Sequence, residues 1–160
     1  MDAPEKDARI CWEDLQAGST MDLGSLSPTA EEIIAFARQF DPQPFHLSEE
    51  GGKASLFGGL CASGWHTCAM AMRLMVTNFL SRSSSLGSPG MENLKWLKPV
   101  YPGDVLRLEQ TIVASRPMAS RPDVGLVRSH WSMFNQHGDK VLHMEGYGMF
   151  RRREVQIPAG

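Results

Sequence analysis

An apolar segment at residues 61–80 places the strongest constraint on the fold of this chain. Polar residues such as His66, Arg73 and Asn78 interrupt it, so we expect a buried core helix rather than a membrane span. Apolar residues would occupy most sides of such a helix: Ala62, Trp65, Ala69, Met72, Met75, Val76 and Phe79. A helix that is apolar on most sides is stable only where other elements cover it. We therefore predict a long central helix wrapped by a β-sheet.

Segments of β type follow this helix to the end of the chain. Residues Leu106, Leu108, Gln110 and Ile112 occupy every second position and are expected to share one face of a strand. The predicted strands cover 20–23, 91–100, 104–115, 123–135 and 140–152, with a hairpin at 136–139 and loops at 81–90 and 116–123. One long helix followed by consecutive antiparallel strands indicates an α+β fold. A length of 160 residues fits a single domain, 1–160.

The segment before the central helix carries signals for another helix. Ser-Pro at 27–28 is typical of an N-cap followed by a proline in the first turn, whereas Thr29 with Glu32 offers a competing capping box. Apolar residues at helical spacing then predict one buried stripe: Ile33, Phe36, Ala37 and Phe40. The residues at 48–50 could begin a short helix, which the Gly-Gly pair at 51–52 disfavours.

Composition and charge narrow the classes of function. The net charge of −2 argues against a nucleic-acid partner, which would require a basic stripe. The three Arg residues at 151–153 are expected to end the last strand in solvent. The N-terminal residues 1–9 are expected to fray, and they contain no apolar signal-peptide core.

The three cysteines indicate a reducing environment. Cys61 and Cys68 would lie about 10 Å apart along one helix, which is too far for a disulfide. Cys11 has no obvious partner in the sequence. We therefore expect a cytoplasmic protein with no membrane partner, in which Cys61 and Cys68 act as small core residues.

Asp41 and His46 form the candidate acid/base pair. They stand five residues apart with two prolines between them, so we expect both on a rigid loop rather than on a helix face. Proton transfer requires two groups held within hydrogen-bond reach of one substrate or water. Gly64 follows near the start of the central helix, where free N–H groups and the helix dipole favour negative charge. Acid, base and oxyanion donor therefore fall within one short segment.

The same residues carry a family resemblance. The pattern F-A-x-x-F-D-x-x-P-x-H at 36–46, followed by a Gly that opens an apolar helix, resembles the MaoC-like dehydratases. That family includes the (R)-specific enoyl-CoA hydratases and has the hotdog fold. The resemblance implies that Asp41 and His46 form a catalytic dyad and that the Gly64 N–H binds the thioester oxygen, with Ser63 and Trp65 beside it as substrate-binding candidates. It further implies reversible hydration of trans-2-enoyl-CoA to 3-hydroxyacyl-CoA, no metal or redox cofactor, and a homodimer or higher homo-oligomer.

Three positions depart from the family pattern, and they leave the substrate open. Gln43 stands where the family usually has Asn, Ser63 replaces a frequent His, and apolar residues around Met72 replace a Ser common among the hydratases. An acyl-CoA thioesterase on the same fold is one alternative, and a non-catalytic acyl-CoA-binding or partner subunit is another.

The candidate residues also have simpler interpretations. Asp41 could cap a turn, His46 could be a surface histidine, and Gly64 could serve close packing of helix and sheet. A packed or surface position is expected for His66. The histidines show no spacing typical of metal ligands: His46, His66, His130, His137 and His143.

Overall fold

One antiparallel sheet forms the frame of the molecule. The computed structural model describes residues 9–154. The strands are β1 (Thr20–Leu26), β2 (Ser85–Gly87), β3 (Met91–Trp96), β4 (Leu106–Pro117), β5 (Val124–Phe134) and β6 (Lys140–Arg151). Their order is β1-β4-β5-β6-β2, and β3 also pairs with β6. The predicted α+β fold is therefore confirmed. The predicted strands are also confirmed, although their ends are shifted. The structure adds one short strand, β2, inside the predicted loop 81–90.

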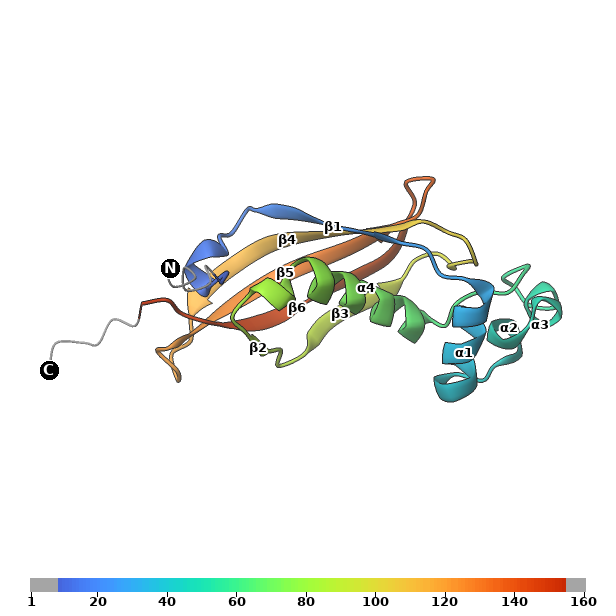
Figure 1. Cartoon of the computed structure of the whole chain (residues 1–160), viewed down its shortest axis with the longest axis horizontal. Helices are drawn as coiled ribbons and strands as arrows, with labels where there is room; N and C mark the ends of the chain where they lie inside the picture. Colours follow the sequence, from blue (N-terminus) through green and yellow to red (C-terminus); the bar gives the residue numbers. More distant parts are fainter. Residues whose placement is uncertain (1–8, 155–160) are drawn as a thin grey trace, which may run out of the picture.

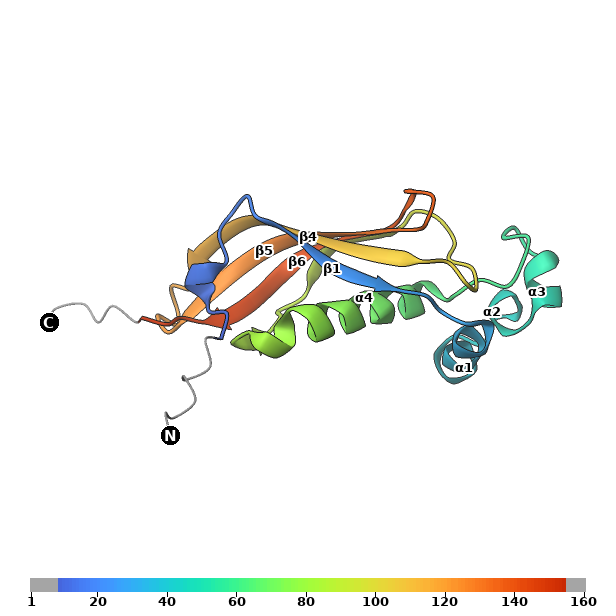
Figure 2. The ribbon, with the colours of Figure 1, turned by 45° about the horizontal axis from the view of Figure 1, so that its top comes forward.

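Helix α4 (Gly64–Asn78) lies along one face of this sheet (Figures 1 and 2). Its buried side chains include Met70, Ala71, Leu74 and Met75. They belong to one apolar core with the inward residues of the strands, among them Leu106, Leu108, Ile112, Val127, Trp131 and Met133. The alternation predicted for β4 is confirmed, since Leu106, Leu108, Gln110 and Ile112 are all buried. The sheet wraps one side of the predicted central helix.

The other side of α4 is open in the single chain. Trp65, Met72 and Val76 are exposed, although the sequence predicted that the sheet would cover them. The reason is geometric, because one sheet covers one face of a helix and leaves the opposite face uncovered. The apolar composition of α4 alone did not reveal which face the sheet would take.

Three short helices project beyond the end of the sheet at which α4 begins (Figure 1): α1 (Ala30–Phe40), α2 (Pro44–Leu47) and α3 (Glu49–Lys53). Thr29 is the N-cap of α1, and its hydroxyl accepts a hydrogen bond from the Glu32 N–H. The capping box therefore determines where α1 begins, not the Ser-Pro pair at 27–28.

One local prediction for this region was wrong, and one that the sequence left open is now decided. His46 lies in the single turn of α2, not on an irregular loop, because Pro44 occupies the first helical position, where its missing N–H costs nothing. Helix α3 forms in spite of the Gly-Gly pair, since the Ser48 hydroxyl caps it by accepting from the Gly51 N–H.

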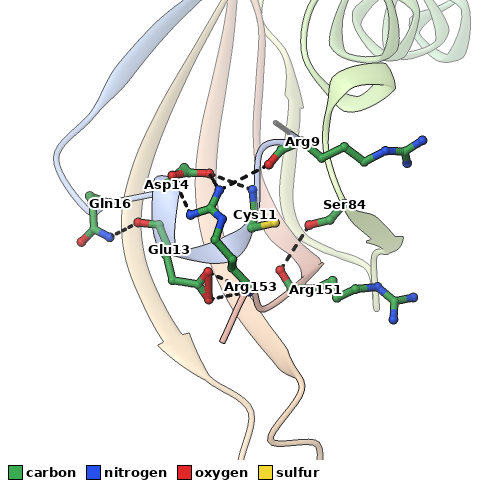
Figure 3. Close-up of polar contacts among 8 residues, drawn as sticks. All are labelled: Arg9, Cys11, Glu13, Asp14, Gln16, Ser84, Arg151 and Arg153. Carbon is green, nitrogen blue, oxygen red and sulfur yellow. Dashed lines mark hydrogen bonds and ion pairs between the residues drawn. The ribbon is translucent and has the colours of Figure 1, made fainter. Parts of the chain in front are cut away.

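An ionic cluster at the opposite end of the sheet joins the first and last described segments (Figure 3). The guanidinium of Arg153 lies 2.6 Å from Asp14 Oδ2, and its backbone N–H donates to the Glu13 carboxylate. Both residues belong to the 3-10 helix η1 (Trp12–Asp14). A second 3-10 helix, η2 (Leu80–Arg82), follows α4. Arg153 is therefore bound to η1, whereas the sequence predicted that the 151–153 cluster would simply face solvent. The predicted fraying of residues 1–9 falls almost entirely outside the described part of the chain.

Within residues 9–154, none of the helices combines the length and the apolar character that crossing a membrane requires.

Replacing Gly52 tests how tightly α3 packs on the segment that leads to α4. A Cβ at this position would collide with the backbone of Gly59 and Leu60. Gly52→Ala is expected to lower the free energy of unfolding by about 1–3 kcal/mol, because a backbone neighbour cannot move aside as a side chain can. Thermal unfolding should show a lower midpoint for this variant and little change for the exposed control Lys53→Ala. Equal midpoints for Gly52→Ala and wild type would contradict this packing.

Candidate functional site

His46 is held by a backbone carbonyl. Its Nδ1 lies 2.6 Å from the carbonyl oxygen of Cys61, and the ring is almost completely buried. The Cys61 N–H in turn donates to the Phe45 carbonyl, which fixes this segment beside α2. Because a carbonyl oxygen can only accept, Nδ1 carries a proton and donates it. In the neutral ring Nε2 is therefore the free, basic nitrogen.

Asp41 lies on the other side of this ring. Its Oδ2 is 3.4 Å from His46 Nε2 and accepts a 2.6 Å hydrogen bond from the Ser63 hydroxyl. Its Oδ1 accepts from the Gln43 side chain at 2.7 Å. Partial burial by itself raises the pKa of Asp41, but the hydrogen bonds from Ser63 and Gln43 and the nearby His46 outweigh it, so the pKa is lowered. Asp41 is therefore an ionised carboxylate at neutral pH.

Ser63 connects this carboxylate to the start of α4. It occupies the N-cap position of the helix, but its side chain makes no capping hydrogen bond, and its hydroxyl donates to Asp41 instead. Gly64 is the first helical residue, and helical geometry leaves the N–H groups of this turn without intrahelical partners. The positive end of the helix dipole lies at the same point.

Trp96 explains why residue 64 has no side chain. A Cβ on Gly64 would overlap the indole ring of Trp96, which comes from β3. The packing interpretation of Gly64 is therefore supported. It does not exclude the oxyanion interpretation, because Gly64 also lines a cavity.

A cavity of about 330 Å³ lies between α2, the start of α4 and the segment after β3. Its lining includes His46, Gly64, Thr67, Trp96 and Lys98. Of the residues predicted for the site, Asp41 and Ser63 are not part of this lining, but both contact residues next to it through the Asp41–His46 pair and the Ser63–Asp41 hydrogen bond. Trp65 lies outside it, with its ring packed edge-on against Trp96 at 5.0 Å. The fold thus brings Asp41, His46, Ser63 and Gly64 together, and it does not bring the Trp65 side chain into the cavity.

Two further titratable groups stand close to this site. Burial and the nearby Asp41 charge raise the pKa of the Cys61 thiol to about 11, so it stays protonated and is a poor nucleophile. His66 is buried and stacks on Phe36 with ring centroids 4.7 Å apart, as expected for a packed histidine.

The outer face of the sheet gathers residues that the sequence kept apart. His130 on β5 and His143 and Glu145 on β6 offer ligand atoms within 4.8 Å of one another. The sequence showed no metal-ligand spacing because this grouping depends on the pairing of His130 with Glu145 across two strands. The Glu145 carboxylate already accepts a hydrogen bond from Asn93 at 2.5 Å and lies 3.5 Å from Arg128.

Two contributors to the site were missed from the sequence. The Cys61 carbonyl is a backbone group, and no residue type signals its direction. Trp96 lies thirty-two positions after Gly64, and only the folding of β3 beside α4 brings the two together. Ser63 was noted as a replacement, but its hydrogen bond to Asp41 was not foreseen.

Comparison with known proteins identifies the family. A profile of the MaoC like domain matches residues 15–130, which is more than half of the chain. The chain belongs to the MaoC-like domain family. Its sheet and central helix form the hotdog fold that the resemblance implied.

Individual relatives of this MaoC-like protein are named for different roles. The crystal structure of a MaoC-like dehydratase from Rhodospirillum rubrum is 44% identical, with a TM-score of 0.84 over 91% of this chain and 99% of that one. The (R)-hydratase PhaJ1 from Pseudomonas aeruginosa shares the fold at 21% identity, with a TM-score of 0.73 over 95% and 96% of the two chains.

Two curated sequences are also similar. YdeM of Bacillus subtilis, named an uncharacterized protein, is 29% identical over 83% of this chain and 93% of its own length. A mesaconyl-CoA hydratase from Cereibacter sphaeroides is 33% identical, but only over 48% of this chain and 22% of its own length.

The Ser63–Asp41 hydrogen bond makes the stability of the protein depend on pH. The pKa of Asp41 is lowered below its ordinary value of 3.8, so its ionised form stabilises the fold above that value and the contribution is lost as pH falls through the lowered pKa. Ser63→Ala should cost about 1.5–3 kcal/mol at neutral pH, the usual contribution of a hydrogen bond to a charged group. The difference from wild type should shrink below the ordinary pKa.

Thermal midpoints measured from neutral to acid pH test this expectation. Ser81→Ala is the matched control, because the Ser81 hydroxyl donates to the Thr77 backbone carbonyl and to no carboxylate. A Ser63→Ala penalty of the same size at every pH would show that the hydroxyl does not act through the charge of Asp41.

Proposed function

We propose that this protein is a hydro-lyase that adds water reversibly across the double bond of a trans-2-enoyl-CoA thioester. The observation that carries the proposal is the contact between Asp41 and a His46 whose tautomer is fixed, beside the open start of α4. The family and the names of its (R)-hydratase and mesaconyl-CoA hydratase relatives support the same reaction class.

His46 carries the proton in this mechanism. With its Nδ1–H donated to Cys61, the free Nε2 takes a proton from water while the water oxygen bonds to Cβ of the substrate. The imidazolium then gives the same proton to Cα, and His46 returns to its neutral form. One water is added, both new bonds form on the face that His46 occupies, and no electron leaves the substrate.

Asp41 supports the charged intermediate of His46. Its lowered pKa makes it a poor proton donor at neutral pH, so it orients the water and stabilises the imidazolium across 3.4 Å. About a fifth of its side chain stays accessible to solvent. Gln43 and Ser63 hold the two carboxylate oxygens in place.

Gly64 supplies the third element of the mechanism. Negative charge develops on the thioester oxygen when water adds at Cβ, and a free N–H at the first turn of α4 is suited to receive it. Gly64 lines the same cavity as His46, which places the first turn of α4 beside the proposed base. Addition of water changes no oxidation state, so the proposal includes no redox cofactor.

A thioesterase is the second candidate on the same fold. It would direct the water to the thioester carbonyl carbon and release CoA. The free Nε2 of His46, held next to a carboxylate, activates water in either reaction, so a single assay must separate them.

The dyad is tested by replacing each member. Asp41→Asn and His46→Ala are each expected to lower kcat for an enoyl-CoA by about 10²–10⁴-fold, because His46 is the general base and acid and depends on the charge of Asp41 to become protonated. Enoyl absorbance and free thiol are followed together across a panel of enoyl-CoAs, with the exposed His137→Ala as the control for loss of a histidine.

The results separate the candidates. Loss of absorbance without thiol release identifies the hydratase, and release of thiol identifies the thioesterase. Binding without turnover identifies a partner subunit. Near-wild-type turnover in either dyad variant would remove Asp41 and His46 from the mechanism.

We further propose that the protein acts as a homodimer. The open face of α4 exposes Trp65 by 60% and Val76 by 42%, and Met91, Trp96 and Leu97 on or next to β3 are exposed by 45–48%. Among the described strands only β6 pairs with β3, so one edge of β3 is free. A free strand edge beside a large apolar surface is typical of an interface between subunits.

Light scattering at micromolar concentration tests the dimer. Wild type should have twice the mass of one chain, and Val76→Glu should be monomeric because a charge would be buried at the interface. Val113→Glu, on β4, is the control for a charge placed at an exposed valine. A monomeric wild type would overturn the proposal.

A further inference from the structure

A second cavity lies farther along α4, between its C-terminal half and the middle of the sheet. It has a volume of about 300 Å³ and is separate from the cavity at His46. Most of its lining is apolar and includes Met72, Met75, Phe79, Val127 and Phe150. No charged residue of the described chain lines it. The catalytic groups proposed above do not account for this cavity.

Three buried polar side chains interrupt this apolar lining, in addition to Ser85, Ser88 and Tyr147, which are more exposed. Gln110 on β4 lies directly across from Trp131 on β5, and its side-chain amide donates to the Ser129 hydroxyl at 3.0 Å. All three residues line the cavity and are more than nine-tenths buried. Gln110 Oε1 and Trp131 Nε1 are buried, yet neither has a hydrogen-bond partner within residues 9–154. Buried polar atoms in proteins are almost always paired, so this donor and this acceptor require a partner.

The chemistry of that partner follows from the two unpaired atoms. A single group that pairs with both atoms accepts a hydrogen bond from the indole N–H of Trp131 and donates one to the amide oxygen of Gln110. A hydroxyl group does both, and it still fits if the Gln110 amide is rotated, because it can then accept from the amide nitrogen. A carboxylate is disfavoured, since the cavity offers no cation to pair with its charge.

The position of the cavity relates it to the proposed reaction. Gly64 borders the first cavity and Met72 the second, and eight residues of helix separate them by about 12 Å. Strand β3 follows the same course, with Trp96 at the first cavity and Met91 at the second. An acyl chain that has its thioester at Gly64 and follows α4 over this distance reaches the second cavity.

We propose that the second cavity selects acyl thioesters that carry a hydroxyl group at the far end of the acyl chain. The choice of a thioester as substrate rests on the proposed function. The choice of a hydroxyl group rests only on the unpaired polar atoms of the cavity. Gln110 and Trp131 are the specificity-determining residues, and Ser129 holds the Gln110 amide.

Matched substrates test the selection. Pairs of trans-2-enoyl-CoAs of equal chain length, one ending in a methyl group and the other in a hydroxymethyl group, are compared by kcat/KM. At the length that reaches the cavity, wild type should favour the hydroxylated substrate by about tenfold or more, because a site with unpaired polar groups rejects an analogue that cannot pair them. Equal values, or a preference for the methyl-ended substrate at every length, would overturn the proposal.

Variants locate the preference in the cavity. Gln110→Met keeps the side-chain volume and removes the amide, and Trp131→Phe removes the N–H. Each variant should bring the ratio of kcat/KM for the hydroxylated and the methyl-ended substrate close to one, while turnover of the methyl-ended substrate continues. Ser115→Ala is the matched control, because the Ser115 hydroxyl is also buried and unpaired in the described chain but lies outside the cavity lining. A ratio unchanged in both Gln110→Met and Trp131→Phe would overturn the assignment.

Calorimetry separates this proposal from the proposed function. Binding of the two corresponding saturated acyl-CoAs is measured with wild type and Gln110→Met, which requires no turnover. Tighter binding of the hydroxylated thioester to wild type alone would support the selection even if no enoyl-CoA were hydrated, and the hydration proposal would then fail by itself. Equal binding of both thioesters, or binding of neither, would overturn the selection.

Discussion

The burial of α4 against the sheet fixes every group around its first turn. Ala71 and Leu74 lie in the same core as the inward side chains of β4 and β5, so the helix cannot slide without opening that core. Its start is therefore held in register with the overhanging helices α1 and α2. Ser63, at the helix cap, uses its hydroxyl on Asp41 rather than on the helix. This bond couples the position of the core helix to the geometry of the candidate site.

The candidate site separates charge from proton transfer. Asp41 is contacted by Ser63, Gln43 and His46, and these contacts keep it ionised although it is partly buried. The imidazole ring of His46 cannot flip, because its Nδ1–H donates to the Cys61 carbonyl. Only Nε2 can therefore exchange a proton. The Cys61 thiol lies 3.7 Å from the same ring, but its raised pKa keeps it neutral. The site therefore offers a single basic nitrogen next to a fixed negative charge, which suits proton transfer to and from one water.

Local signals predicted most of the secondary structure, and the errors arose where two signals competed. Period-2 alternation correctly placed Gln110 on the inner face with its apolar neighbours, because neighbouring side chains in a strand point to opposite faces whatever the tertiary context. The start of α1 was ambiguous, since Ser-Pro and a capping box stood two residues apart, and only the hydrogen bond from Glu32 to Thr29 resolved it. Helix α2 was missed because a single turn has too few residues to show a period.

The sequence by itself determined the helices and strands, since helix periodicity, strand alternation and proline geometry depend on neighbouring residues. It also places Asp41, His46 and Gly64 within one short segment of the chain. Only the tertiary structure decided which atoms meet. The Cys61 carbonyl reaches His46, Trp96 covers Gly64, and the outer-face cluster of His130 with Glu145 forms through contacts between segments far apart in the chain or between backbone groups common to all residues. The exposed side of α4 was decided in the same way. A pattern of apolar residues indicates that a surface will be covered, but the packing of the whole chain decides which surface the sheet covers and which stays exposed.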